Sequence, residues 1–192
     1  MKFVIDANCL ISALIPATGR TLALKGPDGH EIWLSRARNQ LLCGFENGVL
    51  LATEALKEEL APGPQSQGHG KEATGAFIDD LRSRGVTFHR IDPKDQTVLA
   101  ELDEFVRRYF ESHEADKFLR SKDPLYLVVA LRMQASIATL ESQGVAQFNP
   151  RDSKIKGPVK IPYVAWRLGV RTVGLYYVLQ HLDQIDCSAK MA

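Results

Sequence analysis

Three acidic residues stand where the chain passes between a strand-like run and a helix-like run. Asp6 follows the apolar run "KFVI", Glu141 follows "SIATL", and Asp123 precedes the strongly apolar "PLYLVVAL". Carboxylates are rarely buried without a partner, so an acid directly after a buried strand is a candidate for function. These positions predict a site built from carboxylates.

Helical geometry adds a fourth acid from the segment "EALKEEL". Successive helical residues turn by about 100°, so Glu59 lies about 60° from Leu56, the centre of the apolar face. Glu54 and Glu58 fall on the opposite, solvent side. The pattern therefore favours Glu59 as the acid beside the buried face.

Carboxylates brought together repel one another, and removal of water increases the repulsion, so such a cluster needs a cation. Oxygen ligands of this kind suit Mg²⁺ or Mn²⁺. One or two such ions can activate water and stabilise the leaving oxygen of a phosphodiester. The chemistry to expect is metal-dependent phosphodiester hydrolysis.

Other chemistries have less support in the sequence. The five histidines lack ligand spacing, and no convincing Ser–His–Asp or Cys–His set is present. The stretch "GPQSQGHGKE" does not match a phosphate-binding loop, and no strand leads directly into it. A haloacid dehalogenase-like phosphatase would usually carry Asp-x-Asp after its first strand, whereas this chain has "DAN".

Strand-like and helix-like segments alternate along the chain. The predicted strands are 2–5, 49–52, 86–90, 136–140 and 171–175. The predicted helices are 9–15, 35–48, 54–60 (with Thr53 as its cap), 74–84, 93–110, 123–131 and 175–182. This alternation predicts a three-layer α/β/α sandwich with a central, mainly parallel sheet. Ligands of such sheets bind beyond the carboxyl ends of the strands, where Asp6 and Glu141 are expected.

The 192-residue length suits one domain, which we place at 1–183 with a tail at 184–192. Mobile loops are expected at about 17–32 and 61–75, where Gly and Pro are frequent, and a further loop at 142–160. The opening "MKFVID" is no signal peptide and no apolar run is long enough to cross a bilayer, so we expect a cytoplasmic protein without membrane contact. The widely spaced Cys9, Cys43 and Cys187 are interpreted as reduced thiols.

Several of these segments together resemble the PIN-domain nucleases. "FVIDANCLIS" looks like the family's opening strand, acid and short helix, and "LKEEL", "KDPLYLVVAL" and "IATLES" resemble its later acidic motifs in the same order. The C-terminal "VKIPYVAWRLGVRTVGLYYVLQHL" resembles more narrowly a poorly characterised bacterial PIN-like group with a KIP segment. The resemblance covers about two-thirds of the chain.

The resemblance implies an Mg²⁺- or Mn²⁺-dependent endoribonuclease, in many relatives the toxin of a toxin–antitoxin pair. Asp6, Glu59, Asp123 and Glu141 match the catalytic and metal-binding acids. The supporting positions are matched by Asn8, Ser12 and Thr139. The partners to expect are an RNA substrate, an antitoxin protein and a second copy of the chain in a homodimer. Glu141 departs from the family, in which most members place Asp.

Each candidate also has a purely structural interpretation. Asp123 followed by Pro124 is a good helix start by itself, and we expect this carboxylate both to cap the helix and to bind metal. Asn8 could cap the first helix, Ser12 could be a helix-face hydroxyl, and Thr139 could be an ordinary strand residue.

Residues 151–171 hold six Lys or Arg and one acid, which suggests a strip that contacts nucleic-acid phosphates. The predicted contacts are Lys154, Lys156, Lys160 and Arg167. Tyr and Trp residues at 163, 166, 176 and 177 have spacing more typical of core packing than of base stacking. With a net charge of only +1, basic surface must be local. The alternative is a PIN-like binding module whose acids serve a structural ion or a partner.

Overall fold

The computed structural model describes residues 1–15, 23–27, 29, 31–60, 69–141 and 154–185. Its central feature is a five-stranded sheet with the order β5-β4-β1-β6-β7, in which every neighbouring pair is parallel. The strands are β1 (Phe3–Ile5), β4 (Leu50–Thr53), β5 (Phe88–His89), β6 (Ser136–Ala138) and β7 (Thr172–Val173). The predicted α/β class and parallel sheet are confirmed.

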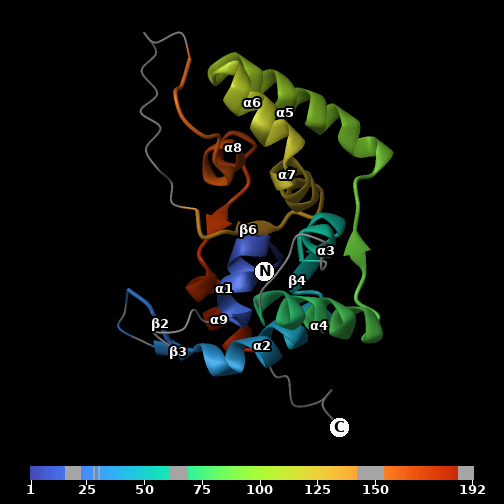
Figure 1. The fold of residues 1–192 in the computed structure, drawn as a ribbon, viewed down its shortest axis with the longest axis vertical. Coiled ribbons are helices and arrows are strands. Elements are labelled where there is room, and N and C mark those ends of the chain that lie inside the picture. The colour runs from blue at the N-terminus through green and yellow to red at the C-terminus, as the bar shows by residue number, and fades with distance from the viewer. Residues whose placement is uncertain (16–22, 28, 30, 61–68, 142–153, 186–192) are drawn as a thin grey trace.

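Helices cover both faces of this sheet, as Figure 1 shows. One layer contains α5 (Gln96–Tyr109), α6 (Ser112–Arg120), α7 (Asp123–Arg132) and α8 (Ile161–Arg167). The opposite layer contains α1 (Ala7–Leu14), α2 (Leu34–Glu46), α4 (His69–Ser83) and α9 (Leu175–Asp183). The short α3 (Glu54–Leu60) follows β4 directly and packs against α1, α4 and β5. This is the expected three-layer sandwich.

The core explains why the central segments lack polar alternation. Phe3, Val4 and Ile5 of β1 are fully buried because helices cover both sides of that strand. Helix α7 packs on β1, β4 and β6 and also touches α5, α6 and α8. Its residues 126–130 are accordingly all buried, as expected for a helix that is apolar all round.

At the end of β4 the structure contains a helix cap that was predicted from the sequence. The Thr53 hydroxyl accepts the backbone N–H of Leu56 at 3.0 Å, which is the predicted cap of the helix that follows. This cap fixes the start of α3, and thereby the direction in which Glu59 leaves the sheet.

The predicted loop at 17–32 is wrong where the structure describes it. Strands β2 (Ala23–Lys25) and β3 (Glu31–Trp33) form an antiparallel hairpin. The connection contains Gly29 with a φ of 80°, a conformation that glycine adopts without strain. Gly26, Pro27 and Gly29 therefore mark the turn of a hairpin, not an irregular loop. The remainder, 16–22, 28 and 30, lies outside the described residues.

The predicted loop at 61–75 is also partly wrong, because α4 begins at His69. Thr74 is buried in this helix, so packing overrides the polar composition of its first turns. Positions 61–68, 142–153 and 186–192 lie outside the described residues. Helix α6 was not predicted, since its acidic and basic residues hide a short apolar face formed by Ala115 and Phe118.

The cysteine interpretation needs one correction. Cys9 is a free, buried thiol as expected, but Cys43 is disulfide-bonded. Cys187, the third cysteine, lies outside the described residues. None of the described helices combines the length and apolar character needed to cross a membrane.

Candidate functional site

Asp6 lies at the carboxyl end of the central strand, with 3% of its surface exposed. Its Oδ1 accepts the backbone N–H of Cys9 at 2.7 Å, so Asp6 is itself the N-cap of α1. Its Oδ2 is buried and has no hydrogen-bond partner among the described residues. Capping therefore explains one carboxylate oxygen, whereas the other is placed where a cation would be favourable.

Burial raises the pKa of Asp6, and the negative charge of Glu141 raises it further. The Thr139 hydroxyl and the backbone N–H groups of Cys9 and Asn8 lower this pKa in opposition. The net result is a pKa of Asp6 above its ordinary value. The surrounding hydrogen-bond donors thus stabilise the negative charge of Asp6 only in part.

Asp123 begins α7 but does not cap it, so that prediction is wrong. The N-cap position belongs to Lys122, without a side-chain cap, and the hydroxyl of Ser121 accepts the Asp123 backbone N–H at 3.1 Å. The Leu125 N–H, which a capping carboxylate at position 123 could accept, donates instead to the Lys122 backbone oxygen at 3.0 Å. Capping no longer accounts for an acid at position 123.

The pKa of Asp123 is raised to about 6, first by burial and next by the charge of Glu141. Glu59 and Asp6 raise it further, and Ser121 opposes the change. The four acids predicted from the sequence therefore act on one another electrostatically. They come from four separate segments, namely the ends of β1 and β6, the start of α7, and α3.

Glu59 is held by Tyr126, whose hydroxyl donates a hydrogen bond to its Oε2. Burial raises the pKa of Glu59 most, the Tyr126 bond lowers it, and Asp6 raises it. Glu58 points elsewhere and pairs with Lys122 at the surface. Both glutamates are exposed, but Glu59 is the one that contacts α7, and its role as a ligand remains a prediction.

Glu141 is engaged on both oxygens. Oε2 accepts the backbone N–H of Ile161 at 2.7 Å, and Oε1 lies 3.2 Å from Nζ of Lys160. These contacts tie the end of β6 to the start of α8. In the part of the chain that the structure describes, no three acidic, His or Cys side chains form a ready set of metal ligands. A divalent ion would therefore compete with Lys160 for Glu141.

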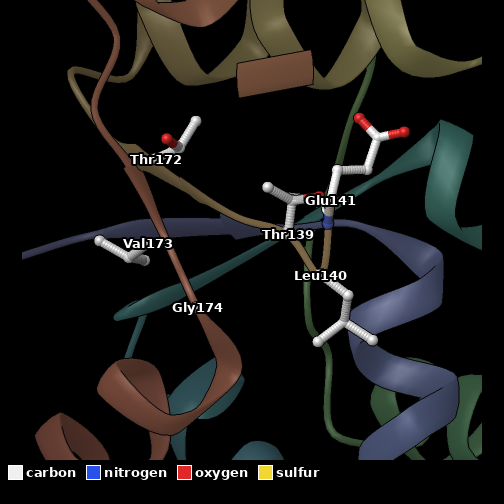
Figure 2. A pocket seen from close by; sticks show the side chains of 6 residues that line it. All are labelled: Thr139, Leu140, Glu141, Thr172, Val173 and Gly174. Atoms are coloured by element: carbon white, nitrogen blue, oxygen red, sulfur yellow. Dashed lines mark hydrogen bonds between the residues drawn. The ribbon is translucent and has the colours of Figure 1, made fainter. Parts of the chain in front are cut away.

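An open pocket of about 380 Å³ lies beside Glu141, where β6 and β7 separate. It is lined by Thr139, Leu140, Glu141, Thr172, Val173 and Gly174. In Figure 2 the side chains of Leu140 and Glu141 point in opposite directions. The pocket thus adjoins the candidate site at Thr139 and Glu141.

The three supporting positions differ in their contacts. Thr139 is buried and accepts the backbone N–H of Glu141 at 3.1 Å, so it joins two acids of the cluster. Asn8 is exposed and Ser12 is half-buried on α1. Within the described residues, no hydrogen bond links either of these two side chains to the acids.

The predicted nucleic-acid contacts occupy different environments. Lys160 enters the acidic cluster, and Nζ of Lys154 donates to the backbone oxygen of Arg107 at 3.1 Å. Lys156 and Arg167 are exposed. The guanidinium of Arg167 lies over the ring of Phe105 at 5.6 Å. Of these four cations, Lys160 is the one with a contact to the acids, so the strip is not uniform.

Sequence reasoning missed the partners of two acids. Tyr126 lies one helical turn after Asp123, and that spacing could have placed it beside the cluster. The pairing of Lys160 with Glu141 had no local signal, because the two residues are 19 positions apart.

Comparison with known proteins does not extend this description. No protein-family model matches the chain, and neither the curated proteins nor the solved structures that were searched gave a match.

Proposed function

We propose that this protein is a metal-dependent endoribonuclease of the PIN type and the toxin of a toxin–antitoxin pair. The proposal is supported above all by the convergence of four acids at the carboxyl end of a parallel sheet, namely Asp6, Glu59, Asp123 and Glu141. The negative charges of the other three raise the pKa of Asp123. A cluster of this kind gains most from a divalent cation.

The residues fit Mg²⁺ or Mn²⁺ in two respects. The donors are carboxylates, which these ions prefer, and the buried Oδ2 of Asp6 lacks a partner among the described residues. We assign Asp6 and Asp123 as the principal ligands, with Glu59 and Glu141 binding directly or through water. When bound, such an ion supplies an activated water and offsets charge on the phosphodiester.

The surrounding residues have supporting roles in this proposal. Tyr126 fixes the orientation of Glu59, and the Thr139 hydroxyl favours the charged form of Asp6. Lys160 neutralises Glu141 and can turn one of its three N–H donors toward a substrate phosphate. Together these residues orient the acids and offset part of the negative charge that an anionic substrate would meet.

The direct test is cleavage of labelled single-stranded and structured RNAs by the purified chain in Mn²⁺, Mg²⁺ or EDTA. Cleavage is expected with either metal and not in EDTA. Asp6→Asn keeps the acceptor for the Cys9 N–H but removes the charge, and cleavage should fall at least a hundredfold. Glu58→Gln, which changes the neighbouring surface acid, should cleave like the native chain. Equal activity of Asp6→Asn and native protein would contradict the proposal.

The toxin role has a separate test. Induced expression in a bacterial host should arrest growth, and the Asp6→Asn variant should not. Growth arrest by both proteins would mean that the toxicity does not come from this site.

The second candidate is a PIN-like binding module without nuclease activity. The contacts of Glu141 with Lys160 and Ile161 favour it, because they satisfy one acid without a metal. This candidate predicts neither Mn²⁺ binding in calorimetry nor cleavage of any RNA.

A further inference from the structure

The outer face of α8 carries an aromatic side chain that the core does not use. Trp166 is 73% exposed, the most exposed of the large apolar residues that the structure describes. The sequence prediction that Trp166 packs in the core is therefore wrong. One exposed aromatic residue needs no explanation by itself. Trp166 differs from other exposed apolar residues because rings and positive charges lie around it.

Trp166 extends a cluster of rings between α8 and α5. Its ring centroid lies 6.5 Å from that of Tyr163, whose ring stacks on Phe105 at 6.0 Å with an interplanar angle of 22°. Tyr163 also meets Phe110 edge-on at 5.4 Å. The rings of Tyr163, Phe105 and Phe110 pack against one another, and Trp166 lies at the solvent-exposed end of this cluster.

Positive charge accompanies these rings. Tyr163, Trp166 and Arg167 recur at intervals of three and four residues, so they share one side of α8. The Arg167 guanidinium packs over Phe105, and the exposed Lys156 precedes the helix. An exposed aromatic ring next to cations is the combination that binds a stacked base together with its phosphate.

The same helix reaches the acidic cluster. The backbone N–H of Ile161, the first residue of α8, donates to Glu141. With a rise of 1.5 Å per residue, Trp166 lies about 8 Å further along the axis. Helix α8 thus carries at one end the contact to Glu141 and at the other Trp166, a separation that a few nucleotides of a single strand can span.

We propose that Trp166 is a base-stacking platform that selects single-stranded RNA and leads it toward the acidic cluster. This inference rests on the proposed function and deepens it by naming the form of the substrate. In a duplex the base faces are hidden, so stacking on Trp166 requires an unpaired strand.

The test is equilibrium binding in EDTA, where no cleavage can occur. The probe is a fluorescent single-stranded RNA of about 12 nucleotides, compared with its duplex. Because stacking is worth about 1–3 kcal/mol per base, Trp166→Ala should weaken binding of the single strand by about tenfold. Trp166→Phe, which retains a ring, should lose less than about threefold of the affinity.

Salt dependence separates stacking from charge. Trp166→Ala should leave the dependence of log K on log salt unchanged, whereas Lys156→Ala should reduce its slope by about 1. Four results would overturn the inference: native affinity in Trp166→Ala, an equal loss for the duplex, absence of RNA binding by the native chain, or Trp166-dependent self-association in sedimentation. Failure of metal-dependent cleavage with this binding pattern intact would instead reject the nuclease and keep the platform.

Discussion

Nζ of Lys160 lies 3.2 Å from Oε1 of Glu141, so the acidic cluster contains a cation of its own. Both side chains keep contact with solvent, since 43% of Lys160 and 22% of Glu141 are exposed. An ion pair with this much exposure is weak and can be exchanged for another cation. The contact indicates a competition between Lys160 and any divalent metal.

Removal of the lysine should therefore improve metal binding. In Lys160→Ala, Glu141 keeps its bond from the Ile161 N–H but loses its counter-charge, and the Kd for Mn²⁺ should fall about three- to tenfold in calorimetry without RNA. Lys156→Ala, an exposed lysine outside the cluster, is the control and should leave the Kd unchanged. Weaker Mn²⁺ binding in Lys160→Ala would mean that the lysine supports the site and does not compete with metal.

The stability of the metal-free chain should depend on Asp123 in a defined pH range. Burial and the neighbouring acids raise its folded-state pKa to about 6, above the ordinary value of 3.8. A raised pKa gives stability that is fully present below the unfolded-state value and is lost as pH rises through the folded-state value. From pH 4 to 7, native protein in EDTA should thus lose about 1–2 kcal/mol relative to Asp123→Asn.

The measurement is urea unfolding of both proteins in EDTA at intervals of pH. The difference between the two free energies of unfolding matters, because Glu58 and Asp116 have lowered pKa values and contribute with the opposite sign in both proteins. A difference that stays constant with pH would show that Asp123 is not perturbed by the cluster. Saturating Mn²⁺ should reduce or reverse the trend.

Much of the arrangement of the candidate site could be predicted because its acids occupy positions with local signals. Asp6 ends an apolar strand, and Glu59 lies at the edge of an apolar helix face, so periodicity was sufficient for both. The rule that parallel strands present their carboxyl ends at one edge then brought Asp6 and Glu141 together.

The remaining features depend on tertiary contacts that no local pattern encodes. Asp123 followed by Pro124 is a typical helix start, yet Lys122 is the N-cap and its backbone oxygen accepts the Leu125 N–H. Trp166 has helical spacing consistent with a core, but the core side of α8 is filled by Val164 and Ala165. Propensity and spacing are weak guides where packing decides which side of a short helix is covered.

Tyr126 offers a test of how the cluster is oriented. Tyr126→Phe keeps the buried ring but removes the hydroxyl that donates to Glu59, and the loss of one such bond should cost about 1 kcal/mol of stability. Because this bond lowers the pKa of Glu59, the variant should need a higher pH for half-maximal Mn²⁺ binding. Tyr177→Phe, on the distant α9, is the matched control. Identical pH profiles for native and Tyr126→Phe proteins would rule out a positioning role.

Neighbouring glutamates on α3 provide the sharpest test of the ligand set. Glu59 faces the cluster and Glu58 pairs with Lys122 at the surface, so the two differ in position but not in chemistry. Saturating Mn²⁺ should raise the Tm of native protein and of Glu58→Gln alike, because a ligand that binds only the folded state stabilises it by RT ln(1 + [L]/Kd). Glu59→Gln should lose affinity about tenfold, which lowers this stabilisation by about 1.4 kcal/mol at a fixed metal concentration. If the metal raised the Tm of both variants equally, Glu59 would not be a ligand, and the helix-face argument would have identified a residue of structural importance alone.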